Sequence, residues 1–392
     1  MRLSVPLVHV LQSSQGGNNN FGNGNGKTQI PLLSPLQDGV SPMESHPIVV
    51  IGDALNWCHT ARIAIGSPPQ YFNAVVDVST SDLTIPSPAS RQTSSPPLHF
   101  YNSSLSRTYK PNGTKISSNP LGIRTSGFLS QDNLHLSDMI VETLLFEEAT
   151  YYDFEDCPYC NWNYDTVLPL GLFNQSATRN FMSPIAKLTS DQLLDENIFS
   201  LRLSRNTHDG IGQLILGGHV DPSFSYGPEF TIPVTNWENE WVEQPNWKAA
   251  ADSITLGDPS VKPYVQHSFG NRTIAVFHTV ISWVVLPHKL AKQMNRALGA
   301  KHWGPYAFID CARRPDLPDL TIVLTGQEFV LTPYDYIIEQ DESGRASCMS
   351  AFLEDVEEEG TIFLGSAFLK TWITVWDWEH RTIGFARAIH TV

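Results

Sequence analysis

An acid and a base stand at equivalent places in two matching segments of this sequence. Val75 to Ser87 reads VVDVSTSDLTIPS, and Ala275 to Pro287 reads AVFHTVISWVVLP. Each segment has an apolar run, a polar residue, small or hydroxyl residues, and then an apolar strand that reaches a proline, which is the signature of an internal repeat at the scale of a domain. The polar residues are Asp77 and His278. A carboxylate and an imidazole brought together can move protons on a bound molecule.

In their sequence context the two segments resemble the active-site motifs of the pepsin-like aspartic peptidase family. In that family each half carries an apolar residue followed by Asp-Thr-Gly-Ser/Thr-Ser, and the two aspartates meet at the interface of two domains. The resemblance covers roughly residues 55–390 and extends to the stretches Ala61 to Asp77, Asp165 to Gly171, Gly212 to Phe224 and Thr361 to Ala388. It implies a mostly β, bilobal pepsin-like fold with two β-barrel-like lobes and a central cleft.

The pattern of short apolar runs bounded by Gly, Pro, Asn and Asp agrees with a mostly β chain. Helices are expected over Ser183 to Leu193 and His288 to Leu298, where apolar residues recur at helical spacing. Three segments are expected. Residues 1–45 form a disordered or propeptide-like N-terminal segment, residues 46–220 an N-terminal β-lobe that carries Asp77, and residues 221–392 a C-terminal β-lobe that carries His278.

Several positions depart from the family's pattern. The motifs read Asp77-Val78-Ser79-Thr80-Ser81 and His278-Thr279-Val280-Ile281-Ser282. In the family two carboxylates share one proton, because both cannot ionise at close range. His278 removes one carboxylate, and we expect Asp77 to hold this imidazole protonated as an ion pair.

The neighbouring positions differ as well. The bracing hydroxyl after the acid is lost at Val78 and kept at Thr279, and the added Cβ atoms of Ser79 and Val280 are expected to narrow the approach of a substrate. No tyrosine stands where the family's flap tyrosine is expected, and Pro120 is nearest to that place. The candidate binding residues are Ser79, Thr80, Ser81, Thr279, Val280, Ile281, Ser282 and Pro120.

Two interpretations of Asp77 and His278 remain open. They are either a relic ion pair without chemistry or an acid/base pair at the floor of the cleft. The departures favour a non-proteolytic protein that binds or transforms a small, largely apolar molecule or peptide, for instance as a biosynthetic enzyme. The alternatives are a residual aspartic-type endopeptidase and an inactive peptide- or protein-binding module. Trp237, Trp241 and Trp247 either line the cleft rim or pack at an edge of a sheet.

Composition narrows the partners. The formal net charge is −15, from 40 acidic and 25 basic residues, which disfavours nucleic acid and anionic membranes. No run approaches the ~20 apolar residues of a membrane span. No phosphate-binding loop, metal-ligand pattern or cofactor motif is present, so no metal and no cofactor are expected. A monomer with a small-molecule or peptide ligand is expected.

Cysteines and sequons indicate the secretory lumen or the outside of the cell. The resemblance implies a disulfide between Cys311 and Cys348. Three alternatives are open for Cys157 and Cys160: a redox motif, a disulfide that closes a turn, or a disulfide from one of them to Cys58. Because the sequence has five cysteines, one thiol should be left unpaired. Glycosylation candidates are Asn102, Asn112, Asn174 and Asn271. The first residues, MRLSVPLVHVL, are read either as a signal peptide or as the remains of a propeptide strand.

Overall fold

β-Strands dominate the computed structural model. It describes residues 48–52, 59–91, 99–118, 124–153, 164–172, 182–205, 212–237, 246–304, 306–342, 345–356 and 360–390. The described strands form three sheets of 13, 8 and 4 strands, and none of these sheets closes into a barrel within the described residues. The predicted mostly β architecture is therefore confirmed, with open sheets where barrel-like lobes were expected.

The 13-stranded sheet combines strands from both ends of the chain. Its main path is β11 (Ser225–Pro233), β25 (Thr382–Ala388), β24 (Trp372–Asp377), β9 (Ile198–Arg202), β10 (Gly212–Leu216), β1 (Ile48–Gly52), β2 (His59–Ile65), β6 (Arg124–Leu136), β7 (Met139–Asp153) and β4 (Thr84–Arg91). Off this path, β3 (Gln70–Asp77) pairs with β2 and β8 (Thr166–Pro169), and β5 (Lys110–Ser118) pairs with β6. The C-terminal strands thus return to pair with β9 and β11.

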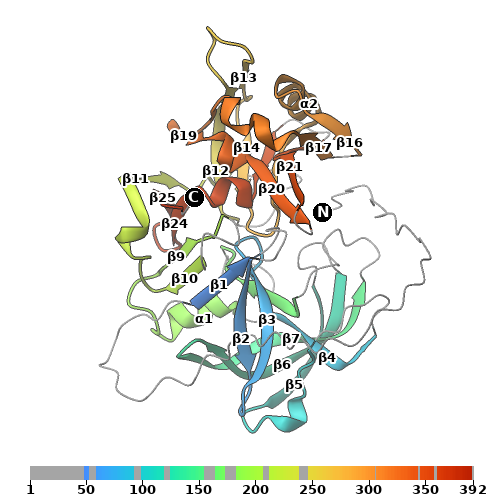
Figure 1. Cartoon of the computed structure of the whole chain (residues 1–392). Helices are drawn as coiled ribbons and strands as arrows, with labels where there is room; N and C mark the ends of the chain where they lie inside the picture. Colours follow the sequence, from blue (N-terminus) through green and yellow to red (C-terminus); the bar gives the residue numbers. More distant parts are fainter. Residues whose placement is uncertain are drawn as a thin grey trace, which may run out of the picture.

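The other two sheets lie at the opposite end of the molecule from β2 to β7 (Figure 1). The 8-stranded sheet runs β19 (Gln327–Leu331), β18 (Leu320–Leu324), β12 (Lys248–Leu256), β14 (Ile274–Phe277), β23 (Thr361–Leu364), β15 (Val284–Pro287), β22 (Phe352–Val356), with β13 (Val265–Ser268) on β12. The 4-stranded sheet runs β16 (Lys301–Trp303), β17 (Tyr306–Ile309), β21 (Arg345–Ser350), β20 (Ile337–Glu342). The division of the chain at residue 220 stays a prediction.

The described helices are few and short. They are α1 (Pro184–Ser190), α2 (His288–Ala297), α3 (Pro333–Tyr336), α4 (Ser366–Leu369) and the 3-10 turns η1 (Ser103–Leu105), η3 (Pro222–Phe224) and η4 (Cys311–Asp316). Both expected helices are present, although α1 ends earlier than predicted, at Ser190. The Ser183 side chain caps α1 by accepting a hydrogen bond from the Ala186 N–H. None of the described helices has the length and apolar character of a membrane span.

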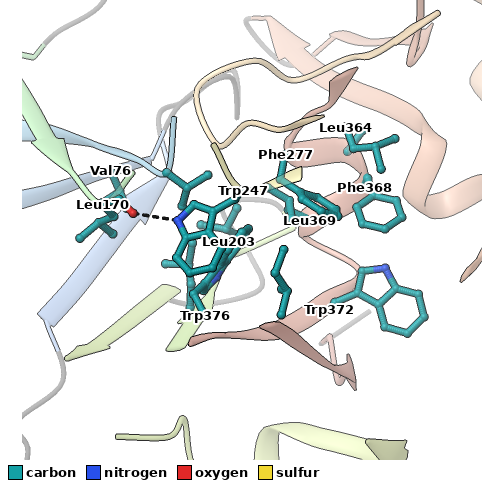
Figure 2. Close-up of a cluster of buried hydrophobic side chains, with 14 of the residues drawn as sticks. Val76, Leu170, Leu203, Trp247, Phe277, Leu364, Phe368, Leu369, Trp372 and Trp376 are labelled. Carbon is teal, nitrogen blue, oxygen red and sulfur yellow. Dashed lines mark hydrogen bonds between the residues drawn. The ribbon is translucent and has the colours of Figure 1, made fainter. Parts of the chain in front are cut away.

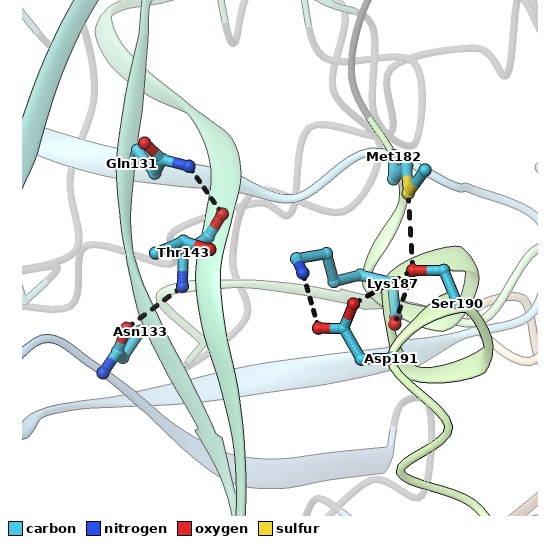
Figure 3. A network of polar contacts seen from close by, with 7 residues as sticks. All are labelled: Gln131, Asn133, Thr143, Met182, Lys187, Ser190 and Asp191. Atoms are coloured by element: carbon cyan, nitrogen blue, oxygen red, sulfur yellow. Dashed lines mark hydrogen bonds and ion pairs between the residues drawn. The ribbon is translucent and has the colours of Figure 1, made fainter.

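The β6–β7 hairpin carries a strained residue that its neighbours hold in place. Thr143 has a positive φ of 53°, which is unusual for a β-branched side chain. The Thr143 N–H donates to Asn133 Oδ1, and its carbonyl accepts from Gln131 Nε2 (Figure 3). In the same view, Lys187 and Asp191 form an i,i+4 pair at the end of α1. The Gln131 and Asn133 side chains thus bond the backbone of Thr143 beside the bulge between Asp132 and Leu134.

A buried aromatic core lies between the two strands that lead to the candidate site. Val76 and Phe277 belong to the same apolar cluster as Trp247 and Trp376 (Figure 2). The Trp247 ring N–H donates to the Leu170 carbonyl at 3.0 Å, so the indole is both packed and satisfied. Residues immediately before Asp77 and His278 are therefore fixed by one continuous core.

The Cys311–Cys348 disulfide that the resemblance implied is present, with a Cα–Cα distance of 5.3 Å. Between the two cysteines lie β18, β19, α3 and β20, and β20 pairs with β21, which carries Cys348. Cys58, Cys157 and Cys160 lie outside the described residues, and so do Asn174, Trp241 and Pro120.

Candidate active site

The two halves of the repeat place Asp77 and His278 by the same local topology. Asp77 is the last residue of β3, which pairs in parallel with β8, and His278 follows β14, which pairs in parallel with β23. The Leu170 N–H donates to the Asp77 carbonyl at 2.7 Å, and the His278 N–H donates to the Leu364 carbonyl at 3.1 Å. Each polar residue therefore opens a loop that is held at its base by the neighbouring strand.

The segment after β8 passes close to the loop that begins at Asp77, and the segment after β23 passes close to the loop that begins at His278. A glycine lies at each close approach. The Gly171 N–H donates to the Thr80 carbonyl, and the Gly365 N–H donates to the Trp283 carbonyl. A Cβ added at Gly171 would overlap the Thr80 carbonyl oxygen, and one at Gly365 would overlap that of Ile281. Glycine is needed at both crossings because only a residue without Cβ allows so close an approach of two backbones.

Thr279 ties the two loops together. Its hydroxyl donates to the Val76 carbonyl at 2.6 Å and accepts from the Val78 N–H at 3.1 Å. Val78, at the equivalent place in the other half, has no hydroxyl and is buried instead. The one-sided brace that the sequence predicted is confirmed.

A serine hydroxyl connects the two polar residues. Ser79 Oγ donates to Asp77 Oδ1 at 2.7 Å and lies 3.2 Å from His278 Nε2. The Ser79 N–H also donates to Asp77 Oδ1, at 2.8 Å. Asp77 Oδ2 is buried and accepts no hydrogen bond from the part of the chain that the structure describes. Asp77 Oδ1 is therefore held by Ser79, whereas Oδ2 keeps an unused capacity to accept a hydrogen bond within the described residues.

The surroundings of His278 disfavour the protonated state that we expected. The Val280 backbone N–H lies 3.3 Å from His278 Nδ1, and because a backbone N–H only donates, Nδ1 is assigned as the acceptor. Burial of the ring lowers the pKa of His278 below its ordinary value, and this effect outweighs the opposing attraction of Asp77. These surroundings favour the neutral imidazole, and with Nδ1 as the acceptor its proton is assigned to Nε2, from which it donates to Ser79 Oγ.

The remaining candidate binding residues mostly face the interior. Val280 is buried against Val75 and Val167, so its side chain does not narrow a substrate path as expected. Ile281 packs in a second apolar cluster with Val276 and Val285. Ser282 is buried, while Thr80 and Ser81 are partly exposed. Among the predicted residues, Asp77, Ser79 and His278 come together, and Thr279 stands behind them.

The bridging role of Ser79 was missed from the sequence. The spacing Asp-x-Ser signals only its bond to Asp77, because a serine two residues after an aspartate commonly bonds back to it, and the contact with His278 has no such local signal. Within the described residues no group of three or more His, Cys, Asp or Glu side chains is placed to hold a metal ion. Asn112 and Asn271 are exposed and Asn102 is partly buried, and all three sequons stay candidates for glycosylation.

Comparison with known proteins gives the family. A family model described as eukaryotic aspartyl protease matches residues 59–388. The chain is 30% identical to vacuolar protease A of Aspergillus fumigatus over 90% of this chain and 84% of that relative. It is 31% identical to cathepsin D of Dictyostelium discoideum, over 89% and 88%. It is 32% identical to vacuolar protease A of Neurospora crassa, over 88% and 82%. The chain belongs to the eukaryotic aspartyl protease family.

These findings contradict the non-proteolytic function that the sequence departures favoured. The relatives that match almost the whole chain are named as proteases or as cathepsin D, and they support neither a pseudo-peptidase nor a small-molecule enzyme. The prediction treated Ser79 and Val280 as obstructions, whereas the structure shows a bridging hydroxyl and a buried valine. It also treated His278 as protonated, although desolvation lowers the pKa of this ring.

Proposed function

We propose that this chain is an aspartic-type endopeptidase in which Asp77 works with His278, in the place of the family's second aspartate. One observation carries the proposal. Ser79 Oγ lies 2.7 Å from Asp77 Oδ1 and 3.2 Å from His278 Nε2, so a single oxygen atom can contact both groups at once. The two groups are therefore close enough to act on one peptide bond, since an acid or base must lie within hydrogen-bond reach of the atom that it serves.

The chemistry then divides between the two residues. Asp77 accepts a proton from a water that attacks the peptide carbonyl, and later returns this proton to the leaving amine. His278 donates from Nε2, and with a peptide bound this one N–H is shared between Ser79 Oγ and the carbonyl oxygen as negative charge develops there. The peptide and one water are converted into a carboxylic acid and an amine, and the protein regains its starting protonation state.

Charge balance supports this division. A carboxylate beside a neutral imidazole carries one negative charge, the same as two carboxylates that share one proton. The neutral form of His278 is favoured because desolvation lowers the pKa of this partly exposed ring below 6.5 and because its Nδ1 accepts from the Val280 N–H. The substitution of an acid by histidine therefore changes which group donates and leaves the charge of the site unchanged.

We infer a compartment from the same features. The Cys311–Cys348 disulfide requires an oxidising environment for its formation. Two relatives are named as vacuolar proteases. Together with the exposed sequons Asn112 and Asn271, these features favour the lumen of the secretory pathway or a vacuole for this chain.

The test is cleavage of an unfolded, fluorescently labelled protein between about pH 3 and pH 7. Asp77→Asn keeps the shape of the side chain and removes the base, so the rate should fall about 100-fold or more. Asp258→Asn is the matched control. Asp258 accepts from the Ser260 N–H and hydroxyl in the same local pattern as Asp77 from Ser79, and it is exposed, so it repeats this turn on the surface of the molecule.

Two outcomes would count against the proposal. If Asp77→Asn cleaves as fast as the wild type, Asp77 is not the base. If the wild type is inactive at every pH while His278→Asp is active, the imidazole cannot replace the acid, although the rest of the site is competent.

A further inference from the structure

We propose that Ser79 is a positioning residue of the active site, whose hydroxyl holds Asp77 and His278 at a fixed separation. This inference rests on the endopeptidase function proposed above. The family's motif has glycine at this position, so the role belongs to this chain and is paired with its histidine.

The local part of the contact is common and proves little alone. Aspartate followed two residues later by serine also occurs at Asp258 and Ser260, where the serine N–H donates to Asp258 Oδ1 at 2.8 Å and the hydroxyl donates to the same oxygen. That turn is exposed. The distinguishing observation is the second contact of Ser79, because its Oγ also meets the ring of His278, a residue far away in the sequence.

The directions of the hydrogen bonds are set by the surrounding groups. His278 Nδ1 faces the Val280 N–H and accepts, so Nε2 carries the proton and donates to Ser79 Oγ. The hydroxyl has one proton, and it donates this proton to Asp77 Oδ1 at 2.7 Å. The His278 Nε2–H therefore donates to Ser79 Oγ, and the Ser79 hydroxyl donates to Asp77 Oδ1. Each of these two protons has an acceptor.

These directions exclude a serine nucleophile. In a serine–histidine pair the imidazole nitrogen accepts the hydroxyl proton. Here Nε2 is the donor and the hydroxyl proton points to Asp77, so His278 cannot activate Ser79 Oγ. Ser79 instead places a neutral group between a carboxylate and an imidazole that would otherwise attract a proton into direct contact.

The effect of removing the Ser79 hydroxyl depends on the residue at position 278. With histidine, removal of the hydroxyl lets the ring close on Asp77 and favours the imidazolium. With aspartate, two carboxylates share a proton directly, and the serine side chain only occupies space beside them. Loss of the hydroxyl should therefore be harmful in the first background and neutral or beneficial in the second.

The experiment combines two readouts on the full chain. First, the pKa of His278 is followed by NMR with 13C-labelled histidine, the signal being assigned by its loss in His278→Asp. Ser79→Ala should raise this pKa, Ser79→Thr should keep it, and Ser260→Ala should leave it unchanged. Second, kcat/KM for an unfolded protein substrate is measured for Ser79→Gly in the wild-type and His278→Asp backgrounds. We expect about a tenfold loss or more in the first and no loss in the second.

Each outcome separates this inference from the proposed function. An unchanged pKa of His278 in Ser79→Ala would overturn the bridge, even in an active enzyme. Equal losses in both backgrounds would show a structural role only, and covalent labelling of Ser79 by a fluorophosphonate would show a nucleophile. If neither enzyme background cleaves any substrate, the endopeptidase proposal fails, whereas the NMR titration still decides the contact of Ser79 with His278.

Discussion

Thr279 is buried, and its hydroxyl serves both loops of the site. Because it donates to the Val76 carbonyl and accepts from the Val78 N–H, Thr279→Val leaves two backbone groups without this partner. We expect the free energy of unfolding to fall by about 2–4 kcal/mol and kcat to fall as Asp77 and His278 separate. Thr374→Val is the matched control, since Thr374 is buried and also makes two hydrogen bonds, to the Leu201 carbonyl and from Trp376.

Urea unfolding and kcat per folded molecule distinguish the two variants. Thr374→Val should lose comparable stability and keep its kcat. If Thr279→Val also keeps its kcat, the brace stabilises the fold without setting the geometry of the site.

At this scale the sequence predicts which residues meet and does not predict their protonation. The repeat brings Asp77 and His278 together because both halves end the same type of strand, and the asymmetry of Val78 and Thr279 is visible in the motifs. The protonation of His278 depends on desolvation of the ring and on the Val280 N–H. The bridge depends on the distance from Ser79 Oγ to His278 Nε2, which lie in different halves of the repeat. Neither quantity is encoded in local spacing.

The parallel strand pairs β3–β8 and β14–β23 are each followed by a crossing at a glycine. Gly171→Ala and Gly365→Ala would force the added Cβ against a carbonyl oxygen, so each should destabilise the fold by about 1–3 kcal/mol and move the attached loop. Gly270→Ala is the control, because no atom lies within 4 Å of its Cβ position and its φ is not in the positive region. Thermal unfolding should place Gly270→Ala within about 0.5 kcal/mol of the wild type. A similar result for Gly171→Ala would mean that the loop relaxes without cost.

Elements with strong local patterns were predictable, and elements set by long-range contacts were not. Helix α2 begins at His288 as predicted because Leu290, Met294 and Leu298 recur at helical spacing. Trp247 follows a polar, acidic stretch, and we expected it either at the rim of the cleft or at the edge of a sheet. It lies in neither place, because its side chain is buried in the core. It is buried because the Leu170 carbonyl and Trp376 surround it, and both lie far from it in the sequence.

For the whole molecule, acid should weaken the fold through its buried histidines. His59 is fully buried, and desolvation together with the charge of Lys370 lowers its pKa from 6.5 to about 3. Between these values the unfolded chain binds a proton that the native chain does not, so stability falls as the pH decreases. The loss from His59 is at most about 5 kcal/mol by pH 3. The lowered pKa of His278 acts in the same direction.

Glu147 acts in the opposite direction. Burial raises the pKa of this carboxyl despite hydrogen bonds from Ser118, Thr125 and Thr84. The native chain therefore takes up its proton at a higher pH than the unfolded chain, and this group adds stability as the pH falls through its native pKa. A carboxyl of this kind offsets part of the cost of the buried histidines in an acidic compartment.

His59→Gln separates these contributions, because glutamine does not titrate and can still donate to the Ser204 carbonyl, which His59 Nε2 contacts at 3.2 Å. Urea unfolding at about pH 7, 5.5 and 4 should show a smaller loss of stability for His59→Gln than for the wild type. His267→Gln, at an exposed position, should follow the wild type. Parallel curves for His59→Gln and the wild type would mean that His59 protonates in the native state at its ordinary pKa. In that case the acid tolerance of this fold would depend on its carboxyl groups.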